Sequence, residues 1–522
     1  MAKTKNFKYI YYLAGIIILA IITYSPTFQN EFTNWDDHKQ VTDNIHIKEI
    51  SFQNLKSIFS SFYVGMYQPF TTSIFSIEHA FFGMSPLGFH SISLLFHLLN
   101  ICLVFWFIRL FTNRQDVALV VAALFSVHPM FVEAVAWVSS SSTLIYASFY
   151  LGAIISYLYY LKTNLKKFLY ITFFLFLCSL LSKVMAITLP ILLLLFDFYY
   201  NRKLISKKVL FEKIPFLILS LLFGIIAVYG RHVEGHISEE FGLLDKPFLI
   251  SYQLVWYVAK FVFPVNLSAY YPGPEKIEGF LPYCYYFGGL LVLLSCYFTC
   301  KLKTYKKSIY FCILFFLINI FLVLNFIQVG NQQTTDRYTY IAYIGFFLLI
   351  AYGYKYILEK KPQLKSLLII VILTIVVLFS YQSYQRTKIW NNSRSLWSDV
   401  ILKNNKLALA HSNLGVTYVG EDNEIAEECF LKAIVLDPGF VIPYNNMGFL
   451  YIEKDPKKAE EYLFKAMSID PSYLYIYTNL ANLYMKTDKL KARKYILKAV
   501  ALNPENKYVL ARVNSWNKQW IR

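Results

Sequence analysis

The sequence predicts an all-α protein in two parts, a bundle of membrane-spanning helices followed by an α-solenoid of short helical repeats. The first observation is composition: 57% of the 522 residues are hydrophobic, only 16% are charged, and the mean hydropathy is +0.44. The second is a succession of apolar runs through residue 384, each near the roughly 20 residues that cross a bilayer as a helix. The third is a repeat that begins after residue 386.

Composition and charge exclude several classes of protein. A soluble globular chain carries about 25% charged residues, so this chain is not a soluble enzyme, and its few Gly (20) and Pro (17) exclude a collagen-like chain. The net charge of +18 would suit a nucleic-acid partner, but cationic loops beside apolar spans explain it better, and we expect no nucleic acid to bind. The seven cysteines form neither a disulfide framework nor a metal-ligand spacing.

Basic clusters assign the two sides of the membrane. The first apolar run follows Lys3, Lys5 and Lys8 and has no small-residue cleavage site after it, so we expect a retained span. The cytoplasmic side is predicted from the N-terminus and from clusters at residues 109–114, 162–167, 202–208, 301–307 and 355–365. About eleven spans result, near residues 9–25, 90–110, 116–138, 143–161, 168–182, 184–200, 213–230, 283–300, 308–327, 338–356 and 366–383.

One apolar run, residues 248–263, does not fit this alternation. As a span it would move the Gly/Pro-rich stretch 264–282 to the other side and reverse every later cluster. The run also contains Gln253 and Lys260. We therefore predict a re-entrant or interfacial helix on the outer side, which leaves the N-terminus inside and the C-terminus outside.

The C-terminal part, residues 386–522, carries the repeat, whereas residues 1–385 form the membrane part. Lys432-Ala-Ile-Val-Leu-Asp-Pro recurs at residues 465 and 498, a step of 33 residues. Gly415, Gly448 and Ala481 recur in phase and let two helices approach closely. The pattern resembles the tetratricopeptide repeat, with copies at 408–440, 441–473 and 474–506 and a half-repeat at 390–405. Such arrays bind peptides or proteins; a rigid spacer is the alternative.

The predicted outer loops carry the first candidate site residues. Asp36 and Asp37 follow the first span, where a carboxylate could act as a general base or hold a metal; a solvated loop is the alternative. Glu78 and His90 come next, with His97 two helical turns beyond His90. A polar face on a membrane helix is costly unless it faces a cavity or a partner.

Further along, a second group of charges falls on the same predicted side. His128 and Glu133 flank a proline-marked helix end. Lys183, Arg231 and Arg337 are cations that could bind phosphate oxygens, although a snorkelling lysine or a structural Asp336–Arg337 pair would also explain them. Carboxylates, cations and a polypeptide-docking array on one side suit an enzyme that takes a lipid-phosphate donor and a protein acceptor.

These motifs together resemble the transmembrane and tetratricopeptide-repeat protein O-mannosyltransferases and their bacterial relatives, of the GT-C glycosyltransferase fold. The motifs are Trp35-Asp-Asp37, Gly88-Phe-His90 with His97, His128-Pro129 with Glu133-Ala-Val-Ala-Trp137, Leu181-Ser-Lys183 with Met185-Ala-Ile-Thr-Leu-Pro190, Asp336-Arg-Tyr-Thr-Tyr340, and Trp390 with Leu396-Trp397. The resemblance implies inverting transfer of a sugar, mannose in the eukaryotic members, from a polyprenyl phosphate to a hydroxyl, with Asp36 or Asp37 as the base.

The chain departs from that family at one motif. Bacterial relatives commonly carry a charged Glu-Arg-Lys-Asp run after the tryptophan motif, whereas this chain has Ser140-Ser-Ser-Thr143. Hydroxyls can still donate hydrogen bonds to phosphate, but without the positive charge. The departure therefore bears directly on how the donor phosphate is bound.

The sequence thus predicts a membrane glycosyltransferase with Asp36 or Asp37 as base, phosphate ligands among Lys183, Arg231 and Arg337, and supporting polar residues Glu78, His90, His128 and Glu133. The expected partners are a polyprenyl-phosphate-linked sugar, a protein or glycan acceptor docked on the repeats, and membrane lipid. No cofactor is specified, and a divalent cation is left open. The expected location is a bacterial inner membrane with periplasmic repeats. The alternatives are an O-antigen polymerase or ligase, which would depend on residues such as Arg231 and His232, and a non-catalytic scaffold.

Overall fold

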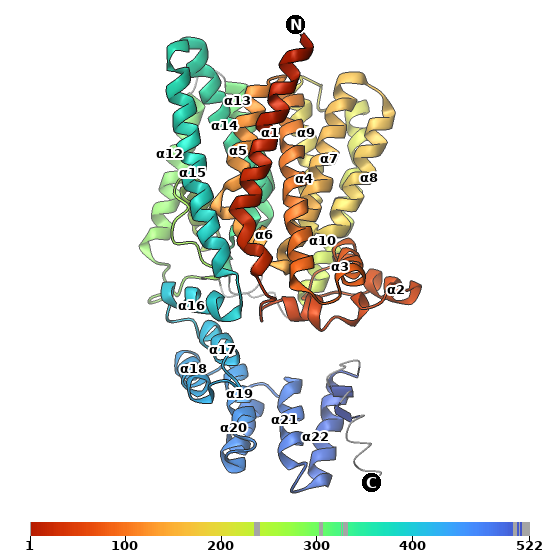
Figure 1. The fold of residues 1–522 in the computed structure, drawn as a ribbon, viewed down its shortest axis with the longest axis vertical. Coiled ribbons are helices and arrows are strands. Elements are labelled where there is room, and N and C mark those ends of the chain that lie inside the picture. Colours follow the sequence, from red (N-terminus) through yellow and green to blue (C-terminus); the bar gives the residue numbers. More distant parts are fainter. Residues whose placement is uncertain are drawn as a thin grey trace. The chain divides into compact units, whose positions relative to one another are not determined.

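The computed structural model describes residues 2–233, 241–301, 306–324, 326, 332–504, 509–510 and 512–513. The chain forms two compact units, Met1–Asn392 and Ser393–Arg522. Almost all regular structure in the described part is helical, as the sequence predicts (Figure 1). Each unit is described by itself below. The predicted third repeat, 474–506, ends at residues outside the described part.

The first unit is a helix bundle whose helices overlap the eleven predicted spans, and residues 325 and 327 of the predicted span 308–327 lie outside the described part. They are α1 (Ala2–Tyr24), α4 (Pro86–Thr112), α5 (Gln115–Val127) with α6 (Val132–Ala136), α7 (Ser141–Thr163), α8 (Lys166–Ser182), α9 (Leu189–Tyr199), α10 (Lys207–Val233), α12 (Tyr283–Lys301), α13 (Lys306–Ile320), α14 (Thr339–Lys360) and α15 (Lys365–Ile389). Seven spans in the described part are long and apolar enough to cross a membrane, or eight if the bent α5–α6 pair counts as one. The chain is therefore an integral multi-pass membrane protein. Two shorter apolar helices lie at Val184–Tyr199 and Tyr283–Ser295 in the described part.

The basic loops meet at one end of the bundle, the upper end in Figure 1 where the N-terminus lies. Side-chain hydrogen bonds join loops that are far apart in sequence: Lys162 Nζ to Asn113 (3.1 Å), Lys208 Nζ to Asn164 (3.2 Å), and Lys307 Nζ to Asn201 Oδ1 (2.5 Å). One shared end for these loops is the arrangement that the alternating-span prediction requires.

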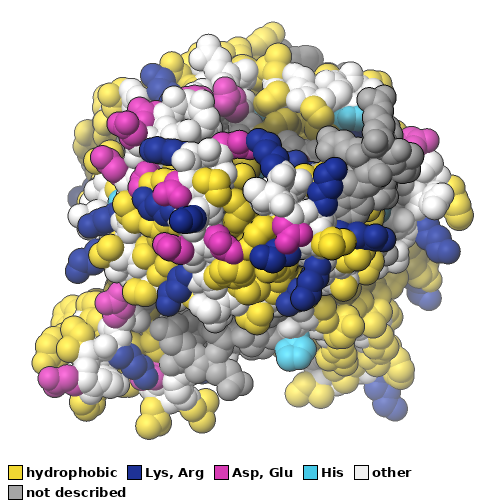
Figure 2. Space-filling view, turned by 90° about the horizontal axis from the view of Figure 1, so that it is seen from below, with side chains coloured by type: hydrophobic (Ala, Val, Ile, Leu, Met, Phe, Trp, Pro, Cys, Tyr) yellow, Lys and Arg dark blue, Asp and Glu magenta, His cyan; other side chains and the backbone are white. Residues whose placement is uncertain are grey.

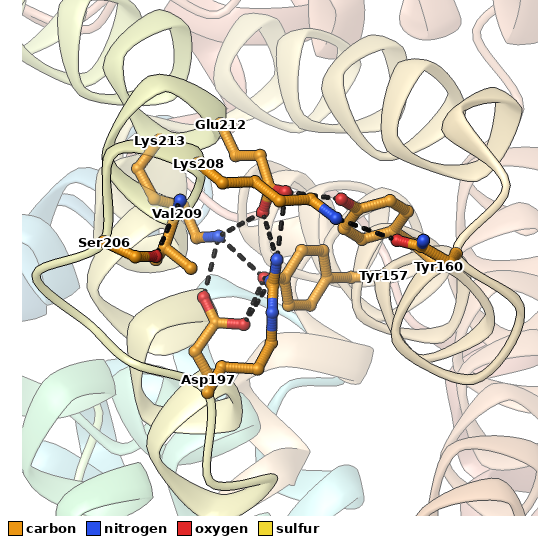
Figure 3. Close-up of polar contacts among 10 residues, drawn as sticks. Tyr157, Tyr160, Asp197, Ser206, Lys208, Val209, Glu212 and Lys213 are labelled. Atoms are coloured by element: carbon orange, nitrogen blue, oxygen red, sulfur yellow. Dashed lines mark hydrogen bonds and ion pairs between the residues drawn. The ribbon is translucent and has the colours of Figure 1, made fainter.

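A buried network of charges lies just inside this end and joins α7, α9 and α10 (Figure 3). Asp197 is fully buried; it accepts a hydrogen bond from Arg202 (2.7 Å) and pairs with Lys213 (2.8 Å), which is 1% exposed. Arg202 also donates two hydrogen bonds of 2.9 Å to Glu212. The hydroxyl of Tyr157 donates to Asp197 and accepts from Lys213. Two acids and two bases therefore satisfy one another, as buried charges must.

The opposite end of the bundle carries the non-spanning elements. They are α2 (Phe52–Ser60), α3 (Pro69–Phe82), α11 (Lys246–Val262) and a small antiparallel sheet of β1 (Tyr271–Pro272) with β2 (Gln332–Thr334). Helix α11, the exceptional run of the sequence, is not among the candidate spans and packs on α12 and α14. The hydroxyl of Tyr343 in α14 donates to the carbonyl of Tyr257 (2.6 Å). A re-entrant course for α11 stays a prediction.

The second unit begins with α16 (Ser393–Lys403) and continues as three helix pairs in the 33-residue step. The pairs are α17 (Ala408–Val416) with α18 (Asn423–Leu436), α19 (Val441–Tyr451) with α20 (Pro456–Ile469), and α21 (Leu474–Tyr484) with α22 (Lys489–Leu502). The second helix of each pair starts at an aspartate whose side chain caps it: Asp422, Asp455 and Asp488.

Small residues hold each helix pair together. A Cβ atom on Gly448 would lie 2.5 Å from Cγ of Leu463, so only glycine lets α19 approach α20 this closely. Figure 2 shows basic and acidic side chains intermixed on the face that it draws. The helix pairs have the geometry that a repeat array needs, and their assignment as tetratricopeptide repeats stays a prediction.

Candidate functional site

Asp37 is a buried carboxylate that ties the first loop to the start of α7. It is 1% exposed. Its Oδ2 accepts from the backbone N–H (2.8 Å) and hydroxyl (2.9 Å) of Thr33, and its Oδ1 accepts from the backbone N–H (2.9 Å) and hydroxyl of Ser139. Burial raises the pKa of Asp37, while these hydrogen bonds lower it. With four donors in place, this carboxylate has little capacity left for a substrate proton.

Asp36, the neighbouring carboxylate, is half-buried and stands in different surroundings. No described residue gives its carboxylate a hydrogen bond. Burial is the largest cause of its raised pKa, and the neighbouring charge of Asp37 raises it further. Arg337 opposes this rise most strongly, followed by Lys39 and Arg231. A carboxylate with spare acceptor capacity, a raised pKa and cations within electrostatic range has the properties of a general base.

Arg337 is fixed against an acid and a tryptophan. Its guanidinium pairs with Glu133 of α6, whose Oε2 also accepts the backbone N–H of Arg337 (3.0 Å). The guanidinium carbon lies 5.2 Å from the ring centroid of Trp137. Trp137 in turn stacks between Trp35 (centroids 4.7 Å apart) and Trp390 (5.5 Å). The indole stack and the ion pair hold Arg337 close to the loop that carries Asp36.

Lys183 lies at the turn between α8 and the short helix η6 (Val184–Thr188), and it contacts the start of α7. Its Nζ donates to the hydroxyls of Thr143 (2.7 Å) and Ser142 (3.3 Å). Arg337, Glu133 and Arg231 lie within electrostatic range of the ammonium. Arg231 also donates to the carbonyl of Val64 (3.2 Å). The structure therefore gathers Asp36, Glu133, Lys183, Arg231 and Arg337 at one end of the bundle, opposite the basic loops.

Glu78 and His90 are two further predicted site residues, and both are buried. Glu78 in α3 is 3% exposed, and burial raises its pKa well above the ordinary range of a glutamate. Its Oε2 lacks a hydrogen-bond partner among the described residues. His90 in α4 is 1% exposed, and the adjacent Phe89 packs on Phe32 of the first loop. The contact of Phe89 with Phe32 places His90 near the first loop.

His128 and His97 have structural surroundings apart from this group of charges. His128 is fully buried at the 58° bend between α5 and α6; it accepts from the backbone N–H of Met130 (3.3 Å) and donates to the carbonyl of Phe261 (3.1 Å). His97 contacts the hydroxyl of Tyr340 (2.7 Å) and the carbonyl of Ser126 (3.1 Å). Both histidines therefore hold backbone and helices in place.

Sequence reasoning missed the contacts of two groups that shape the site. Ser139, Ser142 and Thr143 contact Asp37 and Lys183, and the indoles of Trp35, Trp137 and Trp390 form one stack. The tryptophans stood within motifs, but their stacking could not be read from spacing. Within the described ranges, no three His, Cys, Asp or Glu side chains are grouped closely enough to hold a metal ion.

The fold and the site define a class: a multi-pass membrane protein whose acids and cations gather at one end of its bundle. No family model matches the sequence. Its curated relatives are protein O-mannosyl-transferases, which confirms the relationship predicted from the motifs. The chain is 26% identical to Protein O-mannosyl-transferase F38B6.6 of Caenorhabditis elegans over 81% of its own length and 62% of that protein.

Two further relatives are also named protein O-mannosyl-transferases. The chain is 29% identical to Protein O-mannosyl-transferase Tmtc1 of Drosophila melanogaster over 36% of its own length and 23% of that protein. It is 23% identical to Protein O-mannosyl-transferase TMTC3 of Mus musculus over 71% of its length and 44% of that protein. The chain spans less than two thirds of the length of each relative. A crystal structure of the Archaeoglobus fulgidus oligosaccharyltransferase aligns with 95% of this chain and 72% of its own, at 11% identity and a TM-score of 0.45.

Proposed function

We propose that this chain is a membrane glycosyltransferase that moves a sugar, mannose-like, from a polyprenyl phosphate to a Ser/Thr hydroxyl of a protein or to a glycan, with inversion. The observation that carries the proposal is the Asp36 carboxylate, which is half-buried, has no hydrogen-bond partner among the described residues and lies within electrostatic range of Arg337 and Arg231. The curated relatives, all named protein O-mannosyl-transferases, support the reaction class. The repeats of the second unit would dock a polypeptide acceptor.

The reaction needs one base and one anion-stabilising group. Asp36 takes the proton of the acceptor hydroxyl while the oxygen of that hydroxyl forms a bond to C1 of the sugar. The bond from C1 to the phosphate oxygen breaks, and its electron pair stays on the leaving polyprenyl phosphate. The charge that develops there is stabilised by Lys183, Arg231 or Arg337. Glu133 and the indole stack hold Arg337 in place for this role.

Asp36→Asn tests the assignment of the base. We expect it to lower the rate of sugar transfer at least about 100-fold, since a positioned base contributes about 10²–10⁴-fold. The measurement uses the purified full chain with radiolabelled polyprenyl-phosphate mannose and a Ser/Thr-rich protein acceptor. Asp43→Asn, an exposed acid of the same loop, is the matched control and should leave the rate unchanged.

The neighbouring carboxylate gives a second arm. Asp37→Asn should lower the melting temperature, because a buried carboxylate with four donors is lost. If neither Asp36→Asn nor Asp37→Asn changes the rate of sugar transfer, the proposed mechanism is wrong. A chain that transfers no sugar from any polyprenyl-phosphate donor, yet binds proteins through its repeats, is instead the non-catalytic scaffold.

A further inference from the structure

A run of five hydroxyl residues, Ser139 to Thr143, lies at and just before the start of α7. Ser139, Ser140, Ser141, Ser142 and Thr143 are each no more than 4% exposed, so they do not form a solvated helix start. Ser139 holds Asp37, and the Ser140 hydroxyl lies 3.5 Å from that of Thr143. The hydroxyl of Ser141 has no partner among described residues. A buried polar run needs an explanation in terms of what it contacts.

The contact that explains the run is Lys183. Its ammonium donates to Thr143 and Ser142, at 2.7 and 3.3 Å. The backbone around it is fixed as well, because Lys183 N–H donates to Ser179 (2.9 Å) and the Thr71 hydroxyl donates to the carbonyl of Ser182 (3.0 Å). The lysine is therefore held from both its main chain and its side chain.

The charges around Lys183 leave an excess of positive charge. Arg337 and Arg231 are in electrostatic range, and Glu133, the acid in that range among the described residues, is already paired with Arg337. Burial, followed by Arg337, lowers the pKa of Lys183 to about 7. Hydroxyl oxygens accept a hydrogen bond from the ammonium without cancelling its charge, whereas a carboxylate in their place would neutralise it. This arrangement suits a group that must meet an anion.

We infer that Ser142 and Thr143 are positioning residues that hold the Lys183 ammonium as a ligand for the phosphate of the lipid-linked donor. That the ligand is a polyprenyl lipid rests on the proposed function. That Lys183 binds a phosphate group rests on the geometry alone. Phosphate binding by Lys183 gives these two buried hydroxyls a role, because they orient a cation contributed by another helix end. A phosphate on a polyprenyl chain and free phosphate share this chemistry, so the test separates them.

The test measures equilibrium binding of radiolabelled polyprenyl monophosphate, without sugar, to the purified full chain in nanodiscs. Thr143→Val should weaken binding about tenfold, the size of one hydrogen bond to a charged group. Thr143→Ser should restore affinity to within about twofold, because it returns the hydroxyl. Lys183→Met should weaken binding at least as much, and adding Thr143→Val to it should cause no further loss, since both act through one ammonium. Ser156→Ala, in the same helix and bonded to the carbonyl of Phe168, is the matched control.

Each other outcome is decisive. Unchanged binding by Thr143→Val, failure of Thr143→Ser to restore it, or additive losses with Lys183→Met overturn the inference. Competition by inorganic phosphate as strong as by polyprenyl phosphate overturns the lipid identity of the ligand. If sugar transfer fails in the assay above while this binding pattern holds, the phosphate site stands and the proposed reaction falls.

Discussion

Asp36 and Asp37 are neighbours with the same side chain, yet their surroundings give them different roles. Asp37 receives four hydrogen bonds, two of them from Ser139, 102 residues further along the chain. Asp36 receives none from the described residues and lies within electrostatic range of Arg337, Lys39 and Arg231. The free carboxylate is the one that can take a proton, and the bonded one fixes the loop that presents it.

The raised pKa of Asp36 predicts how transfer depends on pH. A base works deprotonated, and burial raises the pKa of this carboxyl above the ordinary value of about 3.9. The plot of log kcat/KM against pH should therefore fall as the pH drops through that raised pKa, with a slope near one. Asp36→Glu should keep the acidic limb and shift it, whereas Asp36→Asn should remove it from any residual activity. An acidic limb that persists unshifted in both variants would assign it to another group.

The sequence could predict which residues of the candidate site lie on one side of the membrane. It could not predict which of those side chains contact one another. Motifs and topology together placed Asp36, Glu133, Lys183, Arg231 and Arg337 on the outer side, and the structure gathers them. The choice between Asp36 and Asp37 depends in part on Ser139, 102 residues beyond Asp37, and the contact of Lys183 with Thr143 joins residues 40 positions apart. Spacing along one chain carries no such information.

Among the helices, the clearest case of such a long-range arrangement is the buried network of α7, α9 and α10. The basic residues near 202–208 are interpreted as topology signals, but Arg202 donates hydrogen bonds to Asp197 and Glu212, two acids with buried side chains. Lys213 and Asp197 lie 16 positions apart on different helices, and Lys213 lies in the predicted span 213–230. An apolar run predicts that a helix crosses the membrane; which charged side chains it buries depends on the neighbour it packs against.

Lys213→Met tests whether this network stabilises the bundle. Without Lys213 the network keeps two acids, Asp197 and Glu212, but only one cation, Arg202, and we expect this unbalanced buried charge to cost about 3 kcal/mol of unfolding free energy. Lys208→Met in the same helix removes only an exposed lysine bonded to Asn164 and should stay within about 0.5 kcal/mol. The measurement is thermal unfolding of the purified chain in detergent. Equal stability of the two variants would show that the network is not needed for stability.

For the whole molecule, the apolar runs predicted the bundle and the 33-residue step predicted the helix pairs, because both signals are periodic in one chain. Whether α11 spans the membrane could not be predicted from its own residues, since Gln253 and Lys260 interrupt an otherwise apolar run. Its placement came from the alternation of basic loops. The shared end of those loops in the structure makes that alternation consistent, because Asn113, Asn164 and Asn201 each accept a hydrogen bond from a lysine of another loop.

The orientation of the molecule in the membrane follows as a prediction. The basic end should face the cytoplasm, and the chain leaves the first unit after Trp390, which stacks on Trp137 at the opposite end. Two exposed residues report the two sides: Ile205, between α9 and α10, is 91% exposed, and Leu402 in α16 is 87% exposed. A membrane-impermeant maleimide applied to intact spheroplasts should label Leu402→Cys above the unsubstituted chain.

Ile205→Cys should react with the same reagent only after the membrane is permeabilised. The pair is matched, because both positions are open to solvent within their own unit and differ in predicted side alone. The unsubstituted chain corrects for its native cysteines, of which Cys102 and Cys284 are exposed. The reverse pattern would put Asp36, Lys183 and Arg337 on the cytoplasmic side. The donor phosphate would then have to be presented from the inner leaflet, and the repeats could meet only cytoplasmic acceptors.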